Sequence, residues 1–137
     1  MKVEKNKIRF TPFVVDAKVS KDNYAEFEVI NGYLFYDVNI DFSAYDLVEE
    51  SIDPMLPNKY EWNSYSSHEC GNVKLDSIQG ISLTKIEHKN DKEESSFFYE
   101  VTIIGRGATI RISLPNKEEA QELRKELNKL LFDGLES

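Results

Sequence analysis

Polar clusters that could bind a metal are the first places to look for chemistry in this 137-residue chain. The run Asp37-x-Asn39-x-Asp41 has the oxygen donors of a calcium loop. That loop needs a glycine at its sixth position and a glutamate at its twelfth, where this chain has Phe42 and Val48. Because the spacing is that of a strand, we expect the three polar side chains to line a solvent-exposed face.

A second cluster, His68-Glu69-Cys70, offers nitrogen, oxygen and sulfur donors. Zinc needs three or four suitably spaced donors, and the only other histidine, His88, lies on a different segment. A cysteine nucleophile needs a base and a group that orients the base, and the sequence supplies no such set. We therefore predict no catalytic residues, no metal site and no cofactor.

The run Gly105-Arg106-Gly107 lacks the lysine and the following helix of a phosphate-binding loop. It joins two strand-like runs, so we predict a hairpin turn with Arg106 at an exposed tip. Adjacent acids such as Glu49-Glu50 have the composition of a general acid–base pair. Such pairs in loops are more often solvated surface, and we assign them no catalytic role.

Aromatic residues give the clearest indication of recognition. Tyrosine and tryptophan are enriched in binding hot spots, and the alternation of Tyr60 and Trp62 predicts one face of an extended segment. With nearby acids, the predicted partner-binding residues are Tyr60, Trp62, Tyr65, Glu49, Glu50 and Asp53. The alternative is that these aromatic side chains cover the open end of a barrel and serve stability.

The formal net charge of −8 is unevenly placed. Residues 16–69 hold twelve acids and three bases, a local balance of −9. Such a field attracts basic partners and repels nucleic acid and anionic lipid. We expect a protein partner with a basic surface, no nucleic acid and no membrane, although acidity that serves only solubility is an alternative.

The sequence contains few signals that indicate a cellular compartment. No apolar run approaches the roughly 18 residues of a transmembrane helix. The charged start, residues 1–7, is not followed by an apolar core and a cleavage site, so we expect no signal peptide. The single cysteine, Cys70, cannot form an internal disulfide, which is typical of a reducing compartment. We predict a cytoplasmic protein.

The elements that must position these residues follow from hydrophobic periodicity. Strand patterns cover residues 8–19, 24–30, 33–42, 73–76, 78–88, 97–104 and 108–114. Asn31-Gly32 predicts a two-residue hairpin turn, and Thr11-Pro12 predicts a bulge in the first strand. Residues 43–71 break the pattern, and we predict a short helix before Pro54 with Tyr45, Val48 and Ile52 inward, followed by loop.

The strongest local signal is a helix over residues 117–132. Asn116 is a predicted N-cap, and Glu119 completes a capping-box-like pair. An apolar stripe follows at helical spacing, formed by Ala120, Leu123, Leu127, Leu130 and Leu131. We predict that Leu123, Leu127 and Leu130 pack on strand residues Val101, Ile103, Ile110 and Ile112.

Runs at 74–81, 99–105, 110–112 and 116–120 resemble bacterial members of the pleckstrin-homology-like (PH-like) superfamily. The resemblance covers residues 72–132. It implies an α+β fold: a seven-stranded, mostly antiparallel sheet or partly open barrel of PH-like type with one C-terminal α-helix. Residues 1–137 would form a single PH-like domain with an insertion at 43–71.

The resemblance also implies that the fold serves as an adaptor for proteins or peptides. Lipid-binding members cluster lysine and arginine around the first hairpin, whereas Lys18 and Lys21 here lie among acids. We predict a non-enzymatic, intracellular protein-binding domain of adaptor type that engages its partner through the acidic, aromatic insertion. The alternative is an acidic inhibitor or immunity-type protein that mimics nucleic acid or caps a basic active site.

Overall fold

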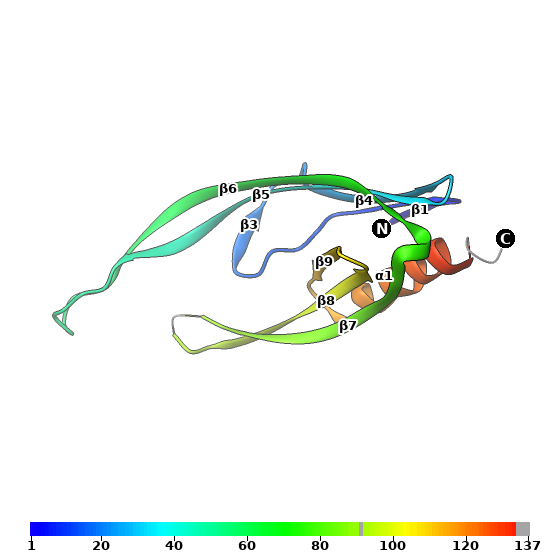
Figure 1. Ribbon diagram of the computed structural model, residues 1–137. Helices are drawn as coiled ribbons and strands as arrows, with labels where there is room; N and C mark the ends of the chain where they lie inside the picture. Colours follow the sequence, from blue (N-terminus) through cyan, green and yellow to red (C-terminus); the bar gives the residue numbers. More distant parts are fainter. Residues whose placement is uncertain (91, 134–137) are drawn as a thin grey trace.

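A computed structural model describes residues 1–90 and 92–133 (Figure 1). In this part of the chain nine strands form two antiparallel sheets, and one α-helix follows them. The elements are β1 (Lys2–Glu4), β2 (Lys7–Phe10), β3 (Ala17–Val19), β4 (Tyr24–Ile30), β5 (Tyr33–Glu49), β6 (Lys59–Lys74), the 3-10 turn η1 (Leu75–Ser77), β7 (Ile78–Lys89), β8 (Ser95–Gly105), β9 (Thr109–Leu114), α1 (Lys117–Asn128) and the π-helical turn η2 (Lys129–Asp133).

The larger sheet is built around β5, a strand of 17 residues. Along one edge β5 pairs first with β4 and then with β3, and along its other edge it pairs with β6. β2 and β1 extend the sheet beyond β4. The smaller sheet has the order β7-β8-β9, and η1 carries the chain from one sheet to the other.

Two local predictions are confirmed. Asn31 and Gly32 have φ values of 50° and 82°, the left-handed geometry of the predicted two-residue hairpin turn between β4 and β5. At the helix start, the Glu119 N–H donates to Asn116 Oδ1 at 2.9 Å, and Asn116 Nδ2 donates to Glu119 Oε2 at 3.1 Å. The Asn116 side chain therefore caps α1 by accepting from the Glu119 N–H, and the Glu119 side chain holds the Asn116 amide in place.

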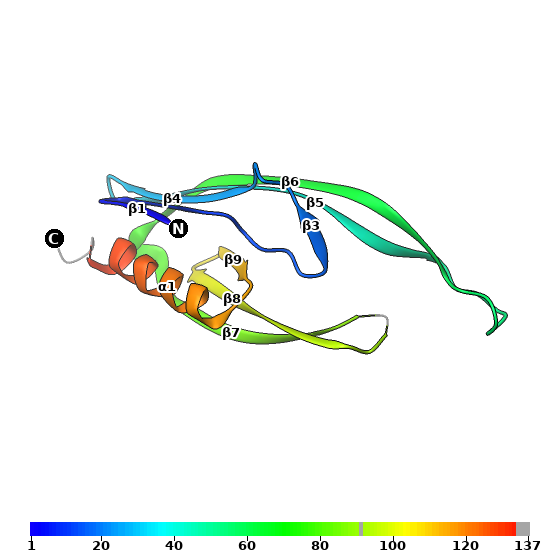
Figure 2. The same cartoon turned by 180° about the vertical axis from the view of Figure 1, so that it is seen from behind.

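One core joins both sheets to the helix. Leu123 and Leu127 of α1 are buried in the same cluster as Val101 of the smaller sheet and Phe27 and Leu34 of the larger sheet. Figure 2 shows α1 alongside β7–β9 and below the larger sheet. The α+β description, a mostly antiparallel, curled half-barrel with one C-terminal helix, is confirmed.

The predicted count of seven strands is wrong, because the first predicted strand is interrupted and β1 precedes it. The run 8–19 contains β2 and β3, and the chain leaves the sheet between them. Pro12 has no N–H for a ladder, and the Phe13 N–H donates instead to Ser113 O of β9 at 3.2 Å. The predicted bulge is therefore an excursion that ties the two sheets together.

The prediction of a short helix and loop over residues 43–71 is also wrong. β5 continues without interruption to Glu49, and β6 begins at Lys59. Only residues 50–58 form a turn, at the end of a long hairpin. Tyr45, Val48 and Ile52, predicted to face inward, are all exposed.

This hairpin extends beyond the rest of the sheet. β3 pairs with β5 only as far as Ala44, so residues 45–62 form a projection of two strands and a turn, which we name the arm. Figure 1 shows the arm reaching away from the rest of the two sheets and the helix, which we name the body, with the shorter β7–β8 hairpin below it.

No helix in the described part of the chain has the length and apolar character needed to span a membrane.

Leu127→Ala should lower the free energy of unfolding by about 2–5 kcal/mol, because a fully buried leucine leaves a cavity between helix and sheets. Chemical denaturation followed by circular dichroism measures the change. Gln121→Ala, on the exposed side of α1, is the matched control and should change stability by less than about 0.5 kcal/mol. Equal effects of the two substitutions would place Leu127 outside the core.

Candidate partner-binding surface

The register of β5 and β6 assigns the paired residues of the arm to one of two faces. Tyr45 lies opposite Trp62 and Leu47 opposite Tyr60, so these four share a face. That face continues the outer side of the sheet, away from the core. Tyr65 has the other parity and lies on the inner side. The structure therefore separates Tyr65 from Tyr60 and Trp62, which share the outer face.

The outer face carries an aromatic cluster formed by Tyr45, Tyr60 and Trp62. The Tyr45 and Tyr60 rings stack with their centroids 5.1 Å apart, and the Tyr45 and Trp62 centroids are 5.2 Å apart. Lys18 of β3 places its Nζ 4.5 Å from the centre of the Trp62 ring, a cation–π contact. Tyr45 is still 54% exposed and Trp62 53%, so ring surface is available to a partner.

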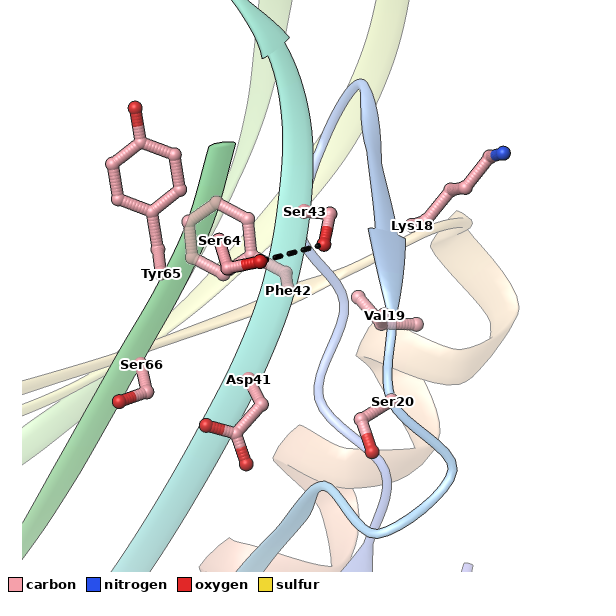
Figure 3. A pocket seen from close by; sticks show the side chains of 9 residues that line it. All are labelled: Lys18, Val19, Ser20, Asp41, Phe42, Ser43, Ser64, Tyr65 and Ser66. Carbon is pink, nitrogen blue, oxygen red and sulfur yellow. Dashed lines mark hydrogen bonds between the residues drawn. The ribbon is translucent and has the colours of Figure 1, made fainter. Parts of the chain in front are cut away.

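A shallow depression adjoins this aromatic cluster (Figure 3). Its volume is about 400 Å³, and its lining consists of Lys18, Val19, Ser20, Asp41, Phe42, Ser43, Ser64, Tyr65 and Ser66. Ser43 and Ser64 point toward one another across the ladder, with their Oγ atoms 3.5 Å apart. Ser43 and Ser64 are the next residues on the outer face after Tyr45 and Trp62. The small polar side chains of the depression therefore lie directly beside the exposed aromatic rings.

The inner face of the hairpin is organised around a carboxylate. Tyr65 stacks on Phe42, with ring centroids 5.1 Å apart, and its hydroxyl donates to Asp46. Asn63 Nδ2 donates to the same carboxylate at 3.0 Å. The hydrogen bonds from Tyr65 and Asn63 lower the pKa of Asp46, and the same contact with Asp46 raises the pKa of Tyr65. Tyr65 therefore orders the hairpin.

The tip of the arm exposes apolar side chains on a locally bonded turn. Ile52, Met55 and Leu56 are 101%, 87% and 61% exposed. The Asp53 side chain accepts a hydrogen bond from the Met55 N–H at 2.9 Å, and its carbonyl accepts from the Leu56 N–H at 3.0 Å. Asn58 Oδ1 accepts from the Ser51 N–H at 2.9 Å. The turn thus presents its apolar residues in a defined geometry.

The predicted acids occupy different places on the arm. Glu49 lies opposite Lys59 at the end of the ladder, and Glu50 is exposed next to it. Asp53 contributes a negative charge, and its hydrogen bonds also stabilise the turn. All three lie near the apolar tip, which gives that end of the arm a negative rim.

Sequence reasoning missed Tyr45, Lys18 and the apolar tip as surface residues. A signal for Tyr45 was present in the sequence. The odd-numbered residues of the predicted strand 33–42 face outward, and extending the same alternation through Ser43 to Leu47 places Tyr45 on that outer face. No local signal places Lys18 over Trp62, since that contact joins residues 44 positions apart.

The polar clusters that suggested chemistry meet through single contacts, and these do not assemble a metal site in the described residues. Strand alternation places His68 and Cys70 on the outer side and Glu69 on the inner side. His68 Nε2 lies 2.7 Å from Asp37 Oδ1, and His88 Nε2 lies 2.8 Å from Asp16 Oδ2, in separate regions. Within residues 1–90 and 92–133, no three His, Cys, Asp or Glu side chains are grouped as metal ligands.

Comparison with protein-family models, curated proteins and solved structures finds no match for this chain. The resemblance to the PH-like superfamily is therefore a prediction that no known relative supports.

Tyr65→Phe should raise the pKa of Asp46 toward the ordinary value of an aspartate, because the main hydrogen bond that lowers it is lost. The stabilisation from this contact is present above that ordinary pKa and disappears as the pH falls through the lowered pKa. NMR titration of the Asp46 carboxyl carbon measures the shift. Tyr45→Phe, on the opposite face, is the control; an unchanged Asp46 pKa in Tyr65→Phe would contradict the assignment.

Proposed function

We propose that this protein is a non-enzymatic protein-binding domain and that its arm carries the partner surface. The observation that supports this most directly is the exposed aromatic cluster of Tyr45, Tyr60 and Trp62. These rings lie outside the core, and stacking and a cation–π contact hold them in place. Ordered aromatic side chains supply contact area at low entropic cost on binding.

The arm offers two kinds of contact to a protein partner. Its outer face combines the aromatic cluster with the polar depression beside it, and its tip exposes Ile52, Met55 and Leu56. Exposed apolar patches with a polar rim are typical of interaction sites. Glu49, Glu50 and Asp53 around the tip favour a partner with a basic surface and would speed association at low salt.

The alternative function, an acidic inhibitor that mimics nucleic acid, has weaker support from the charge distribution. Mimicry needs a continuous stripe of unpaired acids. Glu26 instead accepts a hydrogen bond from Arg9 at 2.7 Å and lies 3.2 Å from Lys7 Nζ. Burial raises the pKa of Glu26, but these bonds lower it by more. Asp37 is similarly engaged, by His68 and Tyr24.

We also propose that the body is a divergent form of the PH-like plan. The support is a curled, antiparallel half-barrel followed by one C-terminal helix that packs into its core. The arm is then an elongation of two neighbouring strands rather than a separate insertion at 43–71. In this arrangement the body is a rigid base, and the arm is the element that recognises a partner.

Trp62→Ala should weaken partner binding by more than about 1 kcal/mol and change the melting temperature only slightly, because Trp62 lies outside the core and its contacts stabilise only the arm. A pull-down from the source cell identifies the partner, and calorimetry with the purified partner measures affinity at low and high salt.

Phe97→Ala is a matched control. Phe97 is 50% exposed on the β7–β8 hairpin and has Lys85 Nζ 4.4 Å from its ring centre, much as Lys18 lies over Trp62. Its removal should leave partner affinity unchanged. A Trp62→Ala protein that melts early and binds normally would show that Trp62 serves stability alone.

A further inference from the structure

Edge strands expose unpaired backbone groups that invite pairing with another chain, and most edges of this molecule are protected. β1 and β3 are three residues long and contain lysine. β7 has a register shift between Ile78 and Gly80, and it carries Lys85 and Lys89. At the edge of β9, the Ser113 carbonyl accepts a hydrogen bond from the Phe13 N–H.

β6 is the exception among the described strands. It is 16 residues long and pairs with β5 along one edge, and no other segment of the described chain forms a ladder with its second edge. From Glu61 to Val73 it has no proline, no lysine, no arginine and no register shift. Figure 1 shows β6 at the rim of the upper sheet.

Hydrogen bonds at Asp41 show which backbone groups of β6 point to the open edge. The Asp41 N–H donates to Asn23 Oδ1 at 2.7 Å, and its carbonyl accepts from the Ser20 N–H at 3.0 Å. Both groups of Asp41 therefore point away from β6, so its partner Ser66 is not hydrogen-bonded to β5. By alternation, the outward-pointing residues are Trp62, Ser64, Ser66, His68, Cys70 and Asn72.

The charge around this edge indicates what would bind there. The paired segments 37–47 and 60–70 contain no lysine or arginine and five acids: Asp37, Asp41, Asp46, Glu61 and Glu69. Even with Lys18, which reaches Trp62 from β3, the balance is −4. A second copy of β6 would bring like charges together, whereas a basic strand would meet opposite charges.

We propose that the open edge of β6 binds an extended segment of a partner protein as an added β-strand, and that this segment carries lysine or arginine at alternating positions. The inference rests on the proposed binding function of the arm and names the mode of recognition. Backbone hydrogen bonds would supply affinity, and the acids and the ring of Trp62 would supply selectivity.

The probe is a synthetic peptide of about ten residues that alternates lysine and valine, with a glutamate–valine peptide as its counterpart. NMR of the ¹⁵N-labelled full chain should show that the lysine peptide shifts the amides of Ser64, Ser66 and His68 and slows their hydrogen exchange. The glutamate peptide should do neither.

Ser66→Pro removes one outward N–H without breaking the bonds between β5 and β6, since proline is tolerated at such edge positions. It should weaken binding of the lysine peptide by about tenfold or more, while Ser66→Ala binds like the parent. Charge reversal at the exposed residues Glu61 and Glu69, both to lysine, tests the same edge without proline. That double variant brings the charge balance of the edge from −4 to zero, so it should lose the preference for the lysine peptide.

Several results would overturn the proposal. These are no β6 amide shifts at about 1 mM lysine peptide, equal binding by the parent and by folded Ser66→Pro, or unchanged preference after charge reversal. A parent dimer in sedimentation that Ser66→Pro dissociates would instead assign the edge to a second copy. If the natural partner still binds Ser66→Pro but not Trp62→Ala, the strand-addition mode fails and the proposed function stands.

Discussion

The pairing of β5 with β6 is the constraint on which both the fold and the proposed binding surface depend. Its register is regular from Tyr33 opposite Lys74 to Leu47 opposite Tyr60. Because side chains alternate along a strand, this single register buries Leu34 in the body and exposes Trp62 on the arm. A slip of one residue in β6 would move Trp62 to the inner side and Tyr65 to the outer side. The same register therefore sets both the core and the proposed recognition surface.

Much of the body could be predicted because its signals are local. The hairpin turn depends on the backbone preferences of Asn31 and Gly32, and the helix start depends on Asn116 and Glu119, only three positions apart. The apolar stripe of the helix could be predicted for a related reason. A helix that buries one face repeats its apolar residues at the helical period. The interruption near Pro12 was visible as a predicted bulge in the first strand. Its meaning was not, since the bond from Phe13 to Ser113 spans 100 residues.

The arm could not be predicted in the same way, because neither of its faces lies on a core. Rules for strands expect one buried apolar face, yet β6 places serine and asparagine on both faces and is exposed along most of its length. Polar composition alone made residues 63–67 resemble a loop. Pro54 and Pro57 did mark a turn, but the prediction extended that turn far into both strands. Of the predicted site, Tyr60 and Trp62 come together, while Tyr65 has a separate role beside Asp46.

An isolated two-stranded hairpin is marginally stable in water, so the arm must gain order from its own side chains. Cross-strand pairs such as Tyr45–Trp62 each contribute about 0.2–1 kcal/mol, and Lys18 links Trp62 to β3 at the base of the arm. On the inner face, Tyr65 and Asn63 converge on Asp46. The contacts that keep the arm extended thus involve the same rings that face solvent, and a partner would meet a surface that is ordered before binding. Ordering of this kind reduces the entropy lost on association, which gives exposed aromatic residues in a strand ladder an advantage over the same residues in a loop.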